Sequence, residues 1–484
     1  MKQSADVWLM GAGAAAFLAY VAMRAWLLPI THDEGSTIIN HVPRLVSDTL
    51  TFQKEANPNN HILNTLGIKF FLSVFFGNQL VVRLPALLGG ALYLWAGIGI
   101  CRRLSAHIWV RLFGFIMLTG NPFLAEFFGL ARGYGLASGL MMMALYYAWR
   151  FFEDGSARTL CTAFVFAGLA VYANFTLLLF FAPFTFLLVW ATWQKNPSWA
   201  VFWPVALPAL STAALYVLLW VMPLSRLRQH PEMVHWEQLP SDFETLRLLM
   251  RSSTCNQLYW GDHTALILSK VAFVVMLAGW MMAVWHWKRQ NWRLAQDPKV
   301  FLAAVFAGAV VVNLLNVHVL HTAHLNARLS LFLYPLFALL LSSMAAWLWE
   351  RVGRFTLIFV VPVLLGVCIN NYWCMNLQRS FEWWFDRSTL AVLDKMKEIQ
   401  TAEGRAEPYT FDANWAVANS FMVHVGEFPQ GYDRVVKSVS WHPDRVPVVG
   451  PDFFFALNRV ELYALDDAYQ VVYKPPVGYL LRKK

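Results

Sequence analysis

Long apolar segments without formal charge are the feature that most restricts the fold of this chain. Five of them cover residues 7–23, 201–221, 271–285, 300–320 and 331–349. A helix of about 20 apolar residues crosses roughly 30 Å of hydrocarbon. Only 14% of the 484 residues are charged, against roughly 25% in soluble domains. The sequence therefore predicts an integral membrane protein, with the lipid bilayer as its first partner.

The basic residues predict how the chain is oriented. They form short clusters between the apolar segments, namely Arg102 with Arg103 and Arg111, Arg150 with Arg158, Lys288 with Arg289 and Arg293, and Arg351 with Arg354. Short loops rich in Lys and Arg stay in the cytoplasm. This places the N-terminus in the cytoplasm and predicts about eleven transmembrane helices. The clusters account for the net charge of +9, so we expect no nucleic-acid partner.

The predicted spans follow from this orientation. Span one covers about residues 7–30, span two 81–100, span seven 200–222, span nine 300–318 and span eleven 355–373. Spans three and four meet outside near Asn121, and spans five and six meet outside near residues 172–174. Within the first outer loop, about 31–80, residues 62–76 are apolar but too short to span and contain Lys69. We expect them to form a helix on the outer surface.

The last 109 residues differ in character from the rest of the chain. Residues 386–400 have the apolar periodicity of an amphipathic helix, and residues 434–440, 460–463 and 471–473 resemble strands. The sequence thus predicts a transmembrane domain over 1–375 and a small extracytoplasmic α/β domain over 376–484. The five cysteines have no metal-binding spacing, but Cys255 and Cys374 both fall outside, where a disulfide is a candidate.

Two adjacent acids, Asp33 and Glu34, directly follow the first span. One interpretation is a polar flank at the membrane interface. The other is a catalytic site with a general base, because burial and crowding of like charges raise a carboxyl pKa toward neutral pH.

Three arginines recur where predicted spans reach the outer surface: Arg83, Arg132 and Arg328. A single arginine there is ordinary snorkelling. Three near a loop with two carboxylates favour an anionic ligand, since guanidinium groups match phosphate oxygens. A further cluster, His318, His321 and His324, spreads over about 120° of a helix, so three ligands to one metal ion would need a kink. The histidines are therefore interpreted as interfacial.

These residues and their neighbours resemble the GT-C superfamily of polytopic glycosyltransferases, which includes protein O-mannosyltransferases and the lipid A aminoarabinose transferase. The matching residues are Asp33, Glu34, Asn59, Asn60, His61, Ile62, Leu63, Gly77, Arg83, Leu84, Pro85, Glu126, Ala131, Arg132, Gly133, Tyr134, Arg328, Tyr334 and Pro335. The order of these residues and their placement relative to the spans carry the resemblance, which covers roughly residues 7–375.

The resemblance implies a GT-C-like fold and a sugar donor on a polyprenyl phosphate, presented from the outer leaflet. It also implies that Asp33 acts as the catalytic base and that Arg132 and Arg328 stabilise the leaving phosphate. Glu34 or Glu126 would tune the base or help to hold a divalent cation, for which His324 is a further candidate ligand, and both roles stay open. No cofactor is certain. The remaining residues expected to support the substrate are Asn60, His61 and Tyr134.

One departure leaves the acceptor open. Many relatives have paired prolines where this chain has Asn59, Asn60 and His61, so the acceptor can be a glycan, a lipid or a protein. The C-terminal domain matches no family and is a candidate to hold that acceptor. The size of the chain and the absence of outer loops rich in glycosylation sites favour a bacterial inner membrane.

Three other functions compete with a transferase. A transporter or lipid-linked-sugar flippase would carry ionisable residues near the bilayer midplane, whereas the acids here lie in outer loops. A scaffold or sensor would leave the acids Asp33 and Glu34 unexplained. An oligosaccharide ligase or polymerase also uses lipid-phosphate donors, and would depend on outer arginines and a histidine such as His61.

Overall fold

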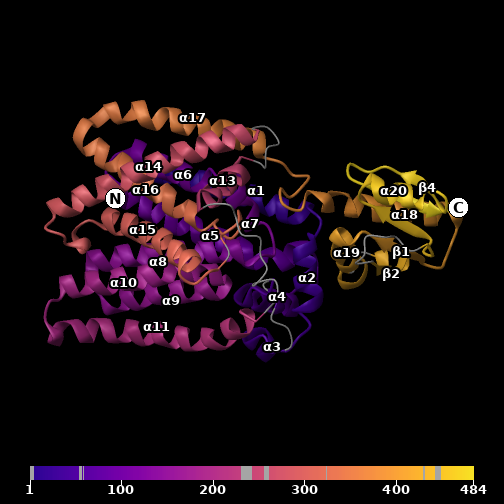
Figure 1. The fold of residues 1–484 in the computed structure, drawn as a ribbon, viewed down its shortest axis with the longest axis horizontal. Coiled ribbons are helices and arrows are strands. Elements are labelled where there is room, and N and C mark those ends of the chain that lie inside the picture. Colours follow the sequence, from indigo (N-terminus) through magenta and orange to yellow (C-terminus); the bar gives the residue numbers. More distant parts are fainter. Residues whose placement is uncertain are drawn as a thin grey trace. The chain divides into compact units, whose positions relative to one another are not determined.

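The computed structural model describes residues 5–53, 57, 59–229, 242–254, 261–322, 324–428, 431–441 and 449–484. Long helices dominate, and a small sheet lies near the C-terminus (Figure 1). The chain forms two compact units. The helical unit comprises Met1–Val21, Leu50–Asn64 and Pro85–Met375, and the mixed unit comprises Ala22–Thr49, Thr65–Leu84 and Asn376–Lys484. The C-terminal residues therefore share a unit with much of the first predicted outer loop.

Every predicted span is helical. The corresponding helices are α1 (Ala5–Leu27), α5 (Gln79–Leu104), α6 (Ile108–Thr119) with α7 (Pro122–Phe128), α8 (Gly133–Asp154), α9 (Ala157–Ala173), α10 (Leu178–Lys195), α11 (Trp199–Leu227), α14 (Asp262–Arg289), α15 (Pro298–His318), α16 (Leu333–Val352) and α17 (Leu357–Cys374). Among the described residues, seven helical stretches are long and apolar enough to cross a membrane. That count takes α16 and α17 together as one stretch of 42 residues, about twice what one crossing needs.

The third span is broken. Helices α6 and α7 meet at 65° and together make an eighth candidate span. The break falls at Gly120 and Asn121, directly before Pro122 at the start of α7. The Asn121 side chain accepts a hydrogen bond from the Leu124 N–H at 3.0 Å and so caps α7, and proline is favoured in the first turn of a helix. The turn predicted near Asn121 is therefore a bend followed by another helical segment, and α8 begins only at Gly133.

Lipid-facing surface is recognisable on the helices of the helical unit. Large apolar side chains are exposed on α11, α14 and α17, for example Leu218, Val274 and Ile358. In contrast, α8 buries most of its residues from Gly133 to Phe151. Large apolar side chains are stable in such exposed positions when lipid surrounds them. Helix α13 (Asp242–Ser253) also belongs to the helical unit.

The cysteines show one covalent link. Cys374, the last residue of α17, is disulfide-bonded, whereas Cys101, Cys161 and Cys368 are free. The other residue of the predicted pair, Cys255, lies outside the described residues.

The mixed unit contains a five-stranded sheet with the order β2-β1-β3-β5-β4. Its strands are β1 (Tyr409–Ala413), β2 (Val436–Ser440), β3 (Phe453–Ala456), β4 (Tyr469–Tyr473) and β5 (Tyr479–Lys483), and its helices include α2 (His32–Asn40), α3 (Val46–Thr51), α4 (Ile62–Val74), α18 (Thr389–Glu403), α19 (Trp415–Met422) and α20 (Arg459–Leu465). Strand β1 is parallel to β2 and β3, and β5 is antiparallel to β3 and β4. Of these helices, α3 and α4 belong to it only in part.

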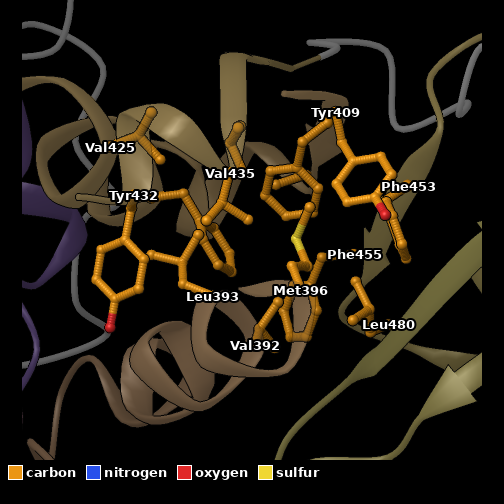
Figure 2. Close-up of a cluster of buried hydrophobic side chains, with 14 of the residues drawn as sticks. Val392, Leu393, Met396, Tyr409, Val425, Tyr432, Val435, Phe453, Phe455 and Leu480 are labelled. Carbon is orange, nitrogen blue, oxygen red and sulfur yellow. The ribbon is translucent and has the colours of Figure 1, made fainter. Parts of the chain in front are cut away.

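The core of the mixed unit lies between α18 and the sheet. Met396 of α18 lies near Tyr409 and Leu480 of the strands, and Leu393 lies beside Tyr432 and Val435, all of them buried (Figure 2). The predicted amphipathic helix over 386–400 is thereby confirmed as α18, with its apolar face buried as expected.

Two of the three predicted strands are confirmed, as β2 and within β4. The prediction of a strand over residues 460–463 is wrong, because these residues belong to α20. Asn458 caps this helix by accepting from the Glu461 N–H at 3.0 Å, and Glu461 in turn accepts from the Leu457 N–H at 2.8 Å. An Asn followed three residues later by Glu favours a helix start, and this local signal outweighs the apolar alternation.

Candidate functional site

The two adjacent acids lie at the start of α2. The hydroxyl of Thr31 accepts from the Glu34 N–H at 3.4 Å, and Glu34 Oε2 accepts from the Thr31 N–H at 2.9 Å. This reciprocal pair is the capping box expected of a Thr-x-x-Glu sequence. Asp33 and Glu34 are both buried. Because neighbours on a helix are rotated by about 100°, the two carboxylates point in different directions.

Glu34 is held by Arg83, which comes from the first turns of α5. Arg83 Nε lies 2.8 Å from Glu34 Oε1, and Nη2 lies 2.7 Å from Oε2. The other donors of Arg83 reach the backbone at the end of α1: Nη1 donates to the carbonyls of Ala25 and Leu28, and Nη2 donates to that of Pro29.

A guanidinium has five N–H donors, and all five of Arg83 have protein acceptors here. Arg83 was predicted as one of three phosphate contacts. In this geometry it instead holds Glu34 and the end of α1 together.

A third carboxyl group, which the sequence did not indicate, lies beside this pair. Asp386, in the short turn before α18, is 1% exposed, and its Oδ2 accepts from the His32 N–H at 2.8 Å. Burial, together with the negative charges of Glu34 and Asp33, raises the pKa of Asp386 well above its usual range, although the His32 N–H opposes the shift. Asp386 therefore holds its proton more tightly than an ordinary carboxyl group does.

Helix α19 contacts the same segment. His424, directly after α19, accepts from the Ile30 N–H through Nε2 at 3.2 Å, and the Ser420 hydroxyl donates to the Ile30 carbonyl. The Asn419 amide lies 3.3 Å from His32 Nε2. The ring of His32 packs edge-on against that of Trp415, with centroids 5.8 Å apart.

A second cluster of predicted residues lies in the helical unit. Arg132, just before α8, donates from Nη2 to Asn59 Oδ1 at 2.9 Å, and its guanidinium carbon is 6.0 Å from the centre of the Tyr134 ring. The His61 ring is 5.0 Å from the same ring. Asn64 donates to the Ala131 carbonyl at 3.1 Å. The structure thus brings together Arg132, His61 and Tyr134.

Gly133 explains how closely this cluster is packed. A Cβ atom at Gly133 would lie 2.0 Å from the Ala173 carbonyl oxygen and 2.7 Å from the His61 Cβ. Asn60 and Glu126 are both buried as well, with Glu126 on α7. Only glycine allows α8 to begin so near His61.

The remaining predicted residues lie at the end of α15 and in the segment that leads to α16. Arg328 is half-buried in the turn before α16. His324 Nε2 lies 3.2 Å from Asp242 Oδ1, and His318 Nε2 lies 2.8 Å from Asp242 Oδ2. One carboxylate on α13 therefore joins two of the histidines that were interpreted as interfacial.

Two of the candidate cation ligands are paired with other side chains. Glu34 is paired with Arg83 and His324 with Asp242. Within the ranges that the structure describes, no group of three or more His, Cys, Asp or Glu side chains is placed to hold a metal ion.

Comparison with solved structures finds the same fold along the whole chain. ArnT from Cupriavidus metallidurans in the apo state superposes with a TM-score of 0.53 and 12% sequence identity, over 98% of this chain and 97% of that one. ArnT from the same organism bound to undecaprenyl phosphate gives a TM-score of 0.52 and 13% identity, over 99% and 98%. No protein-family model matches the chain, and no curated protein matches its sequence.

The chain is thus an integral membrane protein with an ArnT-like fold and a small C-terminal sheet domain. The fold that the sequence resemblance implied is confirmed by this similarity.

Proposed function

We propose that this protein is a membrane glycosyltransferase that moves a sugar from a polyprenyl-phosphate donor to an acceptor hydroxyl. The observation that carries the proposal is the full-length similarity to ArnT, one structure of which holds undecaprenyl phosphate. The position of Asp33 in the first turn after the first span supports it, because the resemblance expects a catalytic acid there.

Of the two adjacent acids, Asp33 suits the role of base better. Both oxygens of Glu34 accept from Arg83, and Oε2 also accepts from the Thr31 N–H. Glu34 therefore serves to fix the first turn of α2. Asp33 lies on another side of that turn and is 9% exposed, so it is shielded from bulk water while remaining able to meet a substrate.

The proposed reaction is a single displacement. The acceptor oxygen attacks the anomeric carbon of the donor sugar, and Asp33 takes the hydroxyl proton as the new carbon–oxygen bond forms. The bond between the anomeric carbon and the phosphate oxygen breaks, and polyprenyl phosphate leaves with the bonding electrons. The configuration at the anomeric carbon inverts.

Negative charge grows on the leaving phosphate, and preorganised cations stabilise such charge. Arg132 and Arg328 are the proposed contacts. Arg83 is not proposed as a phosphate contact, because its five N–H donors already bond to Glu34 and to backbone carbonyls. With the basic loops in the cytoplasm, the reaction takes place at the outer leaflet, and we assign the protein to a bacterial inner membrane.

The test is sugar transfer by membranes that contain the full-length protein. The probes are undecaprenyl-phosphate-linked hexoses and pentoses, each labelled in the sugar, and the products measured are labelled acceptor and free undecaprenyl phosphate. A flippase would move the donor without releasing undecaprenyl phosphate, so this product separates the two functions.

The Asp33→Asn variant should lose about 10²- to 10⁴-fold in transfer rate, the usual contribution of a general base, at normal expression. The control is Asp466→Asn, which alters an exposed carboxylate in the mixed unit and should transfer at the wild-type rate. Full activity of Asp33→Asn would remove Asp33 from the base role, and no release by the wild type from any probe would reject the transferase.

A further inference from the structure

We infer that the C-terminal domain positions the proposed base: Asp386 and α19 hold the backbone of residues 30–35 in the conformation that orients Asp33. This inference rests on the proposed function. It gives the C-terminal domain a role in the reaction centre, in place of the acceptor-binding role that the sequence suggested as a candidate.

The N-terminus of a helix leaves four N–H groups without partners inside the helix. In most helices, nearby side chains or water satisfy them. Here the Thr31 and Glu34 N–H groups are satisfied locally by the capping box. The N–H of His32 instead donates to Asp386, which is 354 positions away in the chain. The start of α2 is therefore completed by a distant part of the sequence.

Ile30, the residue before the capping box, also forms hydrogen bonds with the C-terminal domain. The Ile30 N–H donates to His424 and the Ile30 carbonyl accepts from Ser420, which are 394 and 390 positions away. Ser420 also bonds to the Thr389 hydroxyl at 3.0 Å, so this contact is tied to the start of α18. The backbone on both sides of Thr31 thus depends on the fold of the C-terminal domain.

Helix α2 packs so closely against α19 that no side chain fits at residue 35. A Cβ atom on Gly35 would lie 2.7 Å from the Asn419 carbonyl oxygen and 2.8 Å from its carbonyl carbon. Backbone atoms cannot rotate away as a side chain can. Any side chain at residue 35 would therefore push α19 off α2 and release the contacts at Ile30 and His32.

Asp386 is well suited to a positioning role. Its side chain is 1% exposed, and Oδ2 is committed to the His32 N–H. Its Oδ1 is buried and has no hydrogen-bond partner among the described residues. A protonated Asp386 accepts from the backbone while adding no charge beside Asp33 and Glu34, so it fixes the segment without repelling the base.

Three variants of the full-length protein test this. Asp386→Leu has a side chain of similar size without an acceptor, Asp386→Asn keeps a neutral acceptor, and Gly35→Ala introduces the steric conflict with α19. The matched control is Gly366→Ala on α17, where a Cβ atom would meet nothing within 4 Å. Measurements are the kcat of sugar transfer, the KM for the undecaprenyl-phosphate-linked sugar that the wild type uses best, and hydrogen exchange of the peptide covering residues 30–35.

We expect Asp386→Leu and Gly35→Ala to lower kcat at least tenfold, to change KM less than threefold, and to speed exchange in residues 30–35. Asp386→Asn should retain at least a third of wild-type kcat, and Gly366→Ala should match the wild type in all three measurements. Faster exchange with unchanged kcat would overturn the inference, and so would wild-type exchange in Gly35→Ala. A defect in KM alone would also overturn it, because that result assigns the domain to substrate binding. An inactive wild type would instead reject the proposed function, so the two failures are distinguishable.

Discussion

Arg83 Nη2 lies 2.7 Å from Glu34 Oε2, and neither side chain has any exposure to solvent. The pair joins the start of α5 to the first turn of α2, and through the carbonyls of Ala25, Leu28 and Pro29 it also joins the end of α1. One guanidinium thus fixes three pieces of backbone around the proposed base.

Glu34→Gln should be strongly destabilising. The amide cannot balance the buried charge of Arg83, and breaking one partner of a buried ion pair costs about 3–5 kcal/mol. The measurement is the melting temperature of the full-length protein in detergent. The control is Glu153→Gln, since the pair of Arg103 and Glu153 is partly exposed and such pairs contribute only about 0–1 kcal/mol. Equal stability of the two variants would contradict a structural role for Glu34.

Arg132→Gln should weaken binding of undecaprenyl phosphate. A hydrogen bond to a charged group contributes about 1.5–3 kcal/mol, which corresponds to a loss of roughly 10- to 150-fold in affinity. The Kd is measured by fluorescence quenching or calorimetry on the purified protein. Arg132→Lys keeps the charge and should lose less, and Arg103→Gln should bind as the wild type does. An unchanged Kd in Arg132→Gln would remove this residue from the phosphate contacts.

Local and periodic features of the fold could be predicted from the sequence. The apolar segments correspond to helices because a bilayer requires about 20 apolar residues per crossing, and the amphipathic pattern over 386–400 corresponds to α18. The resemblance also singled out His61, Tyr134 and Arg132, and the structure places these three side chains in one cluster.

Contacts between distant parts of the chain could not be predicted. Nothing around Asp386 distinguishes it from any acid near a helix, because its partner His32 is 354 positions away. The role of Arg83 was also ambiguous, since an arginine at a helix end serves equally for snorkelling, phosphate binding or a buried ion pair. The buried position of Glu34 beside Arg83 shows that the ion pair is the role seen in the structure.

Gly133→Ala should destabilise the helical unit. Its Cβ atom would lie 2.0 Å from the Ala173 carbonyl oxygen, and relief requires movement of backbone or of His61. Overpacking of this kind costs typically about 1–3 kcal/mol, which the melting temperature in detergent will report. Gly11→Ala is the matched control, because a Cβ atom there would meet nothing within 4 Å. If both substitutions were tolerated alike, the close approach of α8 to residue 173 would be disproved.

The stability of the wild type should depend on pH through Asp386. Burial and the charges of Glu34 and Asp33 raise the pKa of this carboxyl in the folded state. Its proton therefore stabilises the fold fully below the unfolded pKa of about 3.9, and this contribution is lost as pH rises through the folded value. Asp386→Asn cannot titrate, so the melting temperature of the wild type should fall relative to that of the variant as the pH rises above about 4. The exposed control Asp466→Asn should track the wild type throughout. Parallel curves for the wild type and Asp386→Asn would mean that Asp386 is already ionised in the folded protein, and it could then no longer be the neutral carboxyl that holds the His32 N–H beside two other acids.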